Sequence, residues 1–122
     1  MGYREIDWSF FKACLLSISK EISKIDLLIN NAGISNKDHP DDLASKTDPI
    51  EFDHIMHTNV TSSLQMTQAF LPLLRKSQDQ PMVINISSGL GSLSKSPRFS
   101  TTSYQCSKVK HKLLTFVQLK EK

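Results

Sequence analysis

A tyrosine and a lysine one helical turn apart form the pair in this sequence with the clearest chemical use. Tyr104 and Lys108 are four residues apart, so on a helix both side chains lie on one face and can reach the same bound molecule. A phenol is a poor acid or base near neutral pH, but a fixed cation beside it favours its ionised form and lowers its pKa. Such a tyrosine can protonate a carbonyl oxygen as hydride arrives, or deprotonate an alcohol as hydride leaves. The spacing alone does not distinguish this pair from a surface tyrosine above a solvated lysine.

Two short apolar runs upstream each end in small or polar residues. The run at 26–29 leads into Asn-Asn-Ala-Gly at 30–33, and the run at 82–86 leads into a serine pair at 87–88. An Asn-Val pair lies between them at 59–60. In this order, and together with Tyr104 and Lys108, these motifs resemble those of the short-chain dehydrogenase/reductase family. The resemblance runs from about Tyr3 to the last residue.

The resemblance implies an α/β fold, a partial Rossmann-like doubly wound parallel sheet with flanking helices. It also implies NAD(P)-dependent hydride transfer between a nicotinamide and a carbonyl or alcohol substrate, with NADP favoured over NAD. In that mechanism Tyr104 is the general acid or base, and Lys108 lowers its pKa and binds the nicotinamide ribose. Ser88 orients the carbonyl, and Asn59 supports a proton relay through a water. The residues that the resemblance assigns to cofactor binding are Asp7, Asn31, Ala32, Gly33, Tyr104 and Lys108.

Several of these residues have simpler structural interpretations. Asp7 precedes a helical pattern and could be its N-cap or first-turn acid instead of approaching the adenine. Gly33 could serve only to let the backbone turn, and an Asn inside a helical stretch, such as Asn59, is usually a helix-end or local backbone partner. Ser87 is the alternative to Ser88 as the carbonyl-orienting hydroxyl.

The family's pyrophosphate site has no counterpart in the sequence, since no Gly-x-x-x-Gly-x-Gly occurs. We therefore expect residues 1–122 to be the central fragment of a short-chain dehydrogenase/reductase domain that lacks the glycine-rich first βα unit and the C-terminal strands. The chain alone should bind cofactor weakly or not at all. Two functions stay open: part of an oxidoreductase, or a catalytically silent fragment that acts through the two retained helices that pair subunits in the family.

Composition excludes several other classes. The chain has 22% charged and 39% hydrophobic residues, which fits neither a disordered chain nor a membrane protein, and its net charge of +3 is not concentrated in a nucleic-acid-binding run. No segment is apolar for long enough to span a membrane. Cys14 and Cys106 are far apart and are expected to be free thiols in the cytoplasm. The expected partners are a small carbonyl or alcohol and, through the two long helices, a second copy of the chain.

The histidines do not predict a metal site. His39 lies in a polar loop, and His54 and His57 are three residues apart on a predicted helix with no further ligand nearby. Solvated side chains explain both patterns, so we expect no metal.

Hydrophobic periodicity predicts the elements that would position the site. Parallel strands buried on both faces are expected at 26–30 and 82–87, with loops at 34–47 and 91–103. A helix from Ser9 should bury Phe11, Leu15, Ile18, Ile22 and Ile25. Asp48, Pro49 and Glu51 predict a capped helix start. A further helix after Asn59 should bury Leu64, Thr67, Phe70, Leu71 and Leu74 and be kinked or loosened at Pro72. The last helix carries the Tyr/Lys pair and an apolar stripe of Val109, Leu113, Phe116, Val117 and Leu119.

Overall fold

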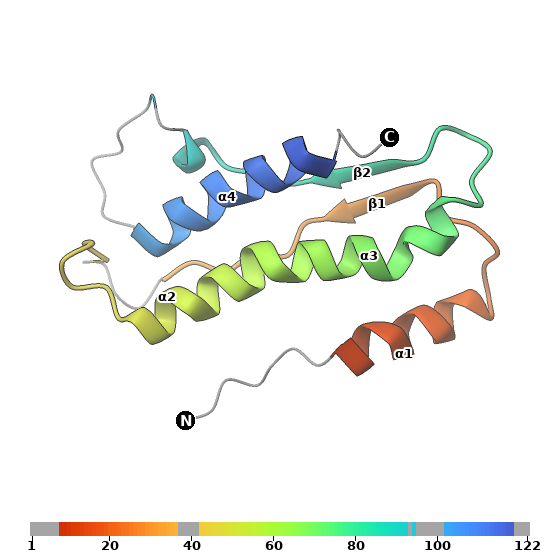
Figure 1. The fold of residues 1–122 in the computed structure, drawn as a ribbon, viewed down its shortest axis with the longest axis horizontal. Coiled ribbons are helices and arrows are strands. Elements are labelled where there is room, and N and C mark those ends of the chain that lie inside the picture. Colours follow the sequence, from red (N-terminus) through yellow and green to blue (C-terminus); the bar gives the residue numbers. More distant parts are fainter. Residues whose placement is uncertain (1–7, 37–41, 93, 95–101, 119–122) are drawn as a thin grey trace.

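The computed structural model describes residues 8–36, 42–92, 94 and 102–118, with only the backbone described for Trp8 and residues 111–118. The elements in chain order are α1 (Trp8–Ser19), β1 (Leu27–Asn30), α2 (Pro49–Met56), the π-helical turn η1 (His57–Thr61), α3 (Ser62–Leu74), β2 (Met82–Asn85), the 3₁₀ turn η2 (Gly89–Gly91) and α4 (Thr102–Gln118) (Figure 1). Asp7, a cofactor-binding candidate, lies outside the described residues, as does most of the 91–103 connection.

The two strands pair in parallel and in register. Leu27 lies opposite Met82 and Asn30 opposite Asn85. The ladder continues past both ends, because Met82 N donates to Asp26 O at 2.9 Å and Ile86 N donates to Asn30 O at 3.0 Å. The predicted parallel arrangement is confirmed, and it brings the ends of both strands to the same edge.

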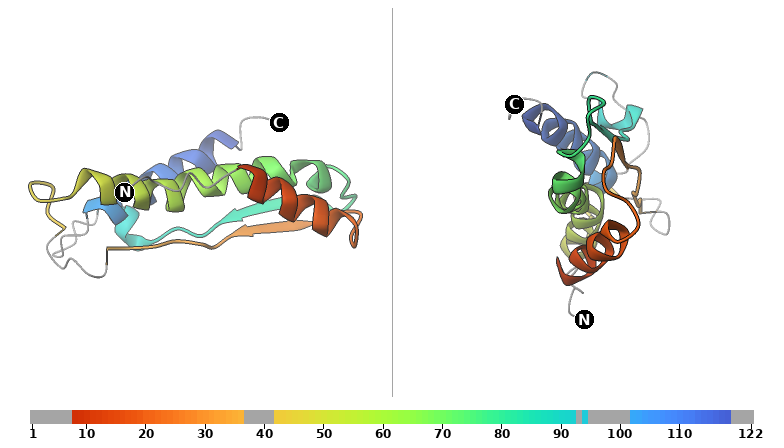
Figure 2. Two further views of the ribbon diagram at one scale, coloured as in Figure 1. Left: turned by 90° about the horizontal axis from the view of Figure 1, so that it is seen from below. Right: turned by 90° about the vertical axis from the view of Figure 1, so that its right-hand side faces the viewer.

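All four helices lie on one side of the strands, which is plain when the molecule is seen from below (Figure 2, left). The expectation that helices cover both faces is therefore wrong for the described residues. The opposite face carries five exposed apolar side chains, and because register pairs share a face they form one apolar surface. We call this surface the open sheet face; its residues are Leu27, Ile29, Met82, Ile84 and Ile86.

The core lies between the strands and the helices α1 and α3. Its buried members are Phe11, Ala69, Phe70 and Leu73, with Leu15, Ile25, Leu28 and Met66 packed against them. The backbone of Ile25 is held against the core by a hydrogen bond, in which its N–H donates to Leu73 O at 3.2 Å. Phe11 and Leu15 thus pack as the helical spacing predicted, whereas Ile25 packs against the core from the segment after α1.

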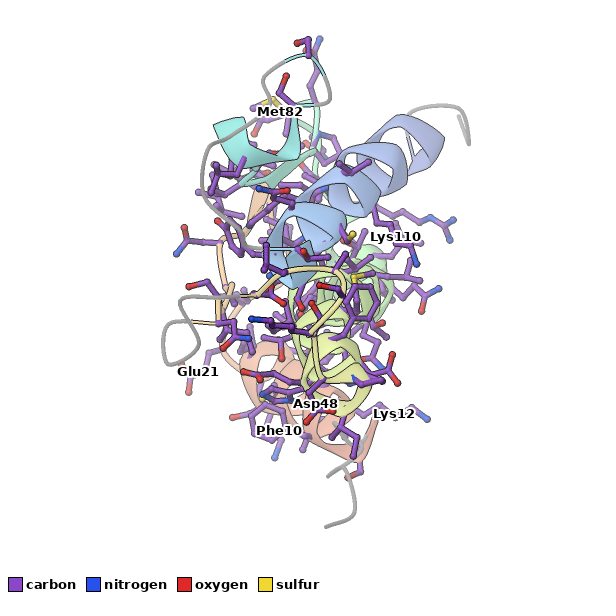
Figure 3. The ribbon with its side chains drawn as sticks, turned by 90° about the vertical axis from the view of Figure 1, so that its left-hand side faces the viewer. Phe10, Lys12, Glu21, Asp48, Met82 and Lys110 are labelled. Atoms are coloured by element: carbon purple, nitrogen blue, oxygen red, sulfur yellow. The ribbon has the colours of Figure 1, made fainter. Side chains whose placement is uncertain are left out.

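Helix α1 is shorter than predicted. It ends at Ser19, whose hydroxyl bonds back to Leu15 O at 2.7 Å, a side-chain contact that competes with helix continuation. The chain then turns, so Ile22 lies outside the helix and is exposed together with Ile18. Figure 3 likewise shows Phe10 on the outer side of α1.

The start of α2 follows the sequence signal. Asp48 is the N-cap and accepts a hydrogen bond from Ile50 N at 2.9 Å, and Pro49 occupies the first turn. Figure 3 shows Asp48 at this end of the helix.

The helix predicted after Asn59 instead begins with the π-helical turn η1, in which Ser62 N donates to His57 O. The extra residue in this turn rotates α3 about its axis relative to α2, whereas the spacing within α3 is that of a regular α-helix. Phe70 and Leu74 are buried as predicted, whereas Leu64 and Leu71 are exposed. The helix continues past Pro72 to Leu74, and Arg75 N donates to Leu71 O at 2.9 Å.

Candidate active site

Lys108 is a buried ammonium beside Tyr104 on α4. Only 5% of its surface is exposed, while Tyr104 is half-buried. The Lys108 Nζ lies 5.3 Å from the centroid of the Tyr104 ring, a cation–π distance, as the four-residue spacing predicts. The pair is therefore not a solvated surface pair.

The Lys108 ammonium has hydrogen-bonding capacity left over. An ammonium carries three donors. Within the described part of the chain its hydrogen bond is a long one, to Ile86 O at 3.4 Å, and no carboxylate pairs with it. A buried charge is costly unless it is paired and hydrogen-bonded. Lys108 is consequently suited to donating hydrogen bonds to a bound molecule.

Asn59 braces the wall of the site through a tertiary network. It is 1% exposed. Its Oδ1 accepts from Ile34 N at 2.8 Å, and its Nδ2 donates to Ile34 O at 2.8 Å and to Ser107 Oγ at 2.9 Å. Ser107 Oγ donates in turn to Tyr104 O at 2.7 Å. The alternative of a merely local helix-end partner is excluded, because these bonds join η1 to the segment after β1 and to α4.

Gly33 faces this network and leaves room beside the ammonium. A Cβ atom at Gly33 would lie 3.4 Å from Lys108 Nζ and 3.5 Å from Asn59 Oδ1. Gly33 does not have a positive φ, so it is not required for the backbone turn that the sequence suggested. Asn31 and Ala32, like Gly33, are exposed at the end of β1. Asp7, the remaining cofactor candidate, is outside the described residues.

Ser88 lies between β2 and the turn η2. It is half-buried, and its Oγ accepts from Leu90 N at 3.2 Å as the N-cap of η2. Since the hydroxyl accepts in that bond, its own proton stays available for donation. Ser87 is exposed and makes no comparable cap. The structure thus gives Ser88 a capping hydrogen bond, and its role as the carbonyl-orienting hydroxyl stays a prediction.

A paired set of amides ties the carboxyl ends of the strands together. Asn30 Nδ2 donates to Asn85 Oδ1 at 2.7 Å and to Thr67 Oγ1 at 3.2 Å. Ligands of parallel α/β sheets bind outside this end of the strands. The same end of the sheet holds Gly33 and Ser88, so the predicted site residues after both strands share one edge.

Sequence comparison connects this geometry with a known family. A model of the short chain dehydrogenase family matches residues 5–121. The chain belongs to the short-chain dehydrogenase/reductase family. It is similar to a short-chain dehydrogenase/reductase of Aspergillus fumigatus, with 36% identity over 88 residues that cover 70% of this chain and 33% of that protein. It is also similar to mouse retinol dehydrogenase 16, with 37% identity over 67 residues that cover 55% of this chain and 20% of that protein.

Solved structures of short-chain dehydrogenase/reductases share the fold. NADPH-bound carbonyl reductase from chicken fatty liver superposes with a TM-score of 0.81 at 32% identity, covering 92% of this chain and 47% of that one. An NADPH-bound short chain dehydrogenase of Escherichia coli CFT073 gives a TM-score of 0.82 at 25% identity, covering 99% and 48%. The chain thus spans less than half the length of these structures and about a third or less of the two curated relatives. The predicted α/β class is confirmed.

Two contributors to this family site were not found from the sequence. Ser107 lies next to Lys108 and joins Asn59 to α4, and Gly91 lets η2 approach α4. A Cβ atom at Gly91 would lie 2.9 Å from Lys108 Cβ and 3.0 Å from its carbonyl carbon. A glycine shortly after a strand-end serine pair is a signal that could have indicated such close packing.

Asp42 was also missed, because it was grouped with a polar loop. It is 2% exposed, and its Oδ2 accepts from Ser103 N at 2.7 Å. Nothing in a local pattern could have indicated a contact across 61 residues.

Two structural findings bear on the surroundings of the site. No helix within the described part of the chain has the length and hydropathy needed to cross a lipid bilayer. Among the same residues, no three His, Cys, Asp or Glu side chains come together in a group that could hold a metal.

Proposed function

We propose that this chain is part of an NAD(P)-dependent oxidoreductase that moves hydride between a nicotinamide and a carbonyl or alcohol. The observation that carries the proposal is the buried Lys108 ammonium, with donors unused among the described residues, 5.3 Å from the Tyr104 ring. Lys108 is a buried cation with unused hydrogen-bond donors, next to a phenol and at the ligand-binding edge of a parallel sheet. This combination is typical of a catalytic or binding site and not of a structural ion pair.

In the proposed reaction each side chain has one role. Tyr104 exchanges a proton with the substrate oxygen, and the Lys108 charge stabilises the phenolate that forms when the proton leaves. Ser88 donates its free hydroxyl proton to the same substrate oxygen and orients it. Asn59 fixes the segment after β1 through its hydrogen bonds to Ile34, and it supports the proton relay. When bound, the nicotinamide supplies or accepts the hydride.

The residues present fit a nicotinamide cofactor at one edge. Lys108 can donate to ribose hydroxyls, and Gly33, with Asn31 and Ala32, offers exposed backbone beside it. Asp7 is proposed to approach the adenine.

We favour NADP over NAD because carbonyl reductase from chicken fatty liver and the Escherichia coli relative were both solved with NADPH. A carbonyl compound is accordingly the proposed substrate class. Free Cys14 and Cys106 favour a reducing compartment, the cytoplasm.

Titration with NADPH, followed by its fluorescence, tests the proposal on the chain as it exists. We expect weak binding, since the chain spans less than half of its solved relatives. Lys108→Met should remove this binding, because it deletes the donors and keeps the length of the side chain. Lys110→Met is the matched control, as Lys110 is exposed on the outside of α4 (Figure 3). Equal NADPH affinity in the two variants would count against the proposal.

One observation favours a second function, a catalytically silent partner-binding fragment. Leu64 and Leu71 are exposed on α3 and are seven residues apart, so they share a face of that helix. In the family this helix and the Tyr/Lys helix pair subunits. Light scattering after size-exclusion chromatography tests this function. The parent chain should be a dimer that Leu71→Glu dissociates. The control Leu16→Glu, on α1, should leave the dimer intact. A monomeric parent chain would contradict this function.

A further inference from the structure

Asp42 holds the first turn of α4 from 60 residues away in the sequence. Its backbone carbonyl accepts from Thr102 N at 3.0 Å and from Thr102 Oγ1 at 2.6 Å. Its carboxylate accepts from Ser103 N at 2.7 Å and from Ser103 Oγ at 3.3 Å. Both backbone and side chain of Asp42 are therefore used to bind one end of one helix.

The partners explain why a carboxylate is buried at this point. Asp42 is 2% exposed, and in the described residues it has hydroxyl and amide donors but no cationic partner. The first N–H groups of a helix have no partner inside the helix and carry partial positive charge. The carboxylate thus does for α4 what an N-cap side chain does, but from a distant segment. Thr47 Oγ1 donates to Asp42 Oδ1 at 2.6 Å and holds the carboxylate in this orientation.

The anchored turn is the one that carries the reacting phenol. Ser103 directly precedes Tyr104, and both Ser103 and Ser107 are fully buried. Helix α4 is therefore held at two points, by Asp42 at Ser103 and by Asn59 at Ser107. Tyr104 lies between these points, and Lys108 lies next to the second.

We infer that Asp42 is a positioning residue. By fixing the start of α4, it sets the positions of Tyr104 and Lys108 relative to Asn59. The catalytic consequence rests on the proposed function, whereas the effect on Lys108 does not. If the first anchor is lost, the first turn of α4 should open and the Lys108 ammonium should become accessible.

Reductive methylation measured at single lysines by mass spectrometry tests the inference without requiring activity. In the parent chain Lys108 should react more slowly than the exposed Lys110, which serves as an internal reference. In Asp42→Ala the ratio of the Lys108 rate to the Lys110 rate should rise about tenfold, the effect expected for loss of a helix cap. Asp42→Asn keeps one oxygen for Ser103 N and should recover most of the protection. Asp53→Ala, at an exposed carboxylate of α2, is the control and should leave the ratio unchanged.

A second measurement separates positioning from general stability. With NADPH and nitrobenzaldehyde as the probe substrate, Asp42→Ala should lower kcat at least tenfold with little change in the KM for the aldehyde, and Asp42→Asn should restore kcat. An unchanged Lys108 ratio in Asp42→Ala would overturn the inference. So would a change at both lysines that Asp42→Asn fails to rescue. If the parent chain shows no turnover, the labelling ratio alone decides the role of Asp42.

Discussion

The side-chain amide of Asn59 pairs with both backbone polar groups of Ile34, accepting from its N–H and donating to its carbonyl, each at 2.8 Å. These two hydrogen bonds fix the segment after β1 against the π-helical turn η1. The second Nδ2 hydrogen goes to Ser107, so one amide joins three parts of the chain. The extra residue of η1 accompanies this placement, as π-helical turns often do at functional sites.

Replacing Asn59 by Asp should strongly destabilise the fold. The carboxylate keeps an acceptor for Ile34 N but cannot donate, which leaves Ile34 O and the Ser107 hydroxyl oxygen without the amide donor and introduces a buried charge. We expect a loss of about 3 kcal/mol in the free energy of unfolding, measured by urea denaturation. Asn31→Asp, at an exposed position, should change it by less than about 0.5 kcal/mol. Similar losses in both variants would contradict the role assigned to Asn59.

Gly91 should not tolerate even one added methyl group. A Cβ atom at this position would lie 2.9 Å from Lys108 Cβ and 3.1 Å from Lys108 O, so η2 or α4 would have to move. We expect Gly91→Ala to cost about 1–3 kcal/mol, the range for overpacking, and to displace Lys108. In Gly89→Ala the new atom has nothing within 4 Å and should be harmless. Thermal unfolding of Gly91→Ala and Gly89→Ala compares the two sites. Equal unfolding midpoints would show that η2 can shift away from α4 at little cost in stability.

In a form of the protein extended to a complete domain, Tyr104→Phe should abolish turnover and leave cofactor affinity nearly intact. The change removes only the hydroxyl, whereas the ring stays over Lys108 and the Ser107 bond to the Tyr104 backbone is unaffected. A lost general acid or base typically costs about 100- to 10,000-fold in rate. The measurement is NADPH oxidation with a carbonyl substrate, with Tyr3→Phe as the control for the only other tyrosine. Full activity in Tyr104→Phe would exclude the proposed proton transfer.

A surface network around Asp26 should make stability pH-dependent on the acid side. The Ser77 hydroxyl, at 2.5 Å, and then the Lys24 ammonium, at 3.1 Å, hold the pKa of the Asp26 carboxyl below its ordinary value of 3.8. A carboxyl with a lower pKa in the folded state contributes stability that is fully present above its unfolded value and is lost as pH falls through the folded value.

We therefore expect the difference in melting temperature between the parent chain and Asp26→Asn to be present above about pH 4 and to shrink as the pH falls further. The effect should be small because the network is exposed to solvent. Asp53→Asn, at an exposed carboxylate, should show no such trend. A difference that grows on acidification would mean that the sign is wrong.

The open sheet face should promote association of the isolated chain. Ile29 is 52% exposed and Met82 57% exposed, and a contiguous apolar surface of this kind normally contacts another surface. Ile29→Lys should reduce binding of the dye ANS and raise solubility with little loss of stability. Ile50→Lys on α2 removes an even more exposed aliphatic side chain outside this face and should do neither. If both variants behave alike, the open sheet face is not the cause of association.

The reliable parts of the sequence prediction rest on short-range physics. The strands, the Asp48 cap and the Tyr104–Lys108 face follow from short apolar runs, capping chemistry and helical spacing, which act between near neighbours in the sequence. The predicted burial of Leu64 and Leu71 was wrong because, at the period of about 3.6 residues of α3, both lie on the face away from the buried Ala69 and Leu73. The expected burial of both sheet faces was wrong because a strand's own residues do not specify where its covering helices lie.

The sequence by itself determined which side chains of the family motifs the chain carries: a phenol, an amine and a hydroxyl in family order. Only the tertiary structure decided that Lys108 is buried with donors to spare, that Asn59 joins Ile34 to Ser107, and that Asp42 caps α4. Each of the last two depends on contacts between segments 25 to 61 residues apart. Such contacts form only when the core packs, and local propensities do not encode them.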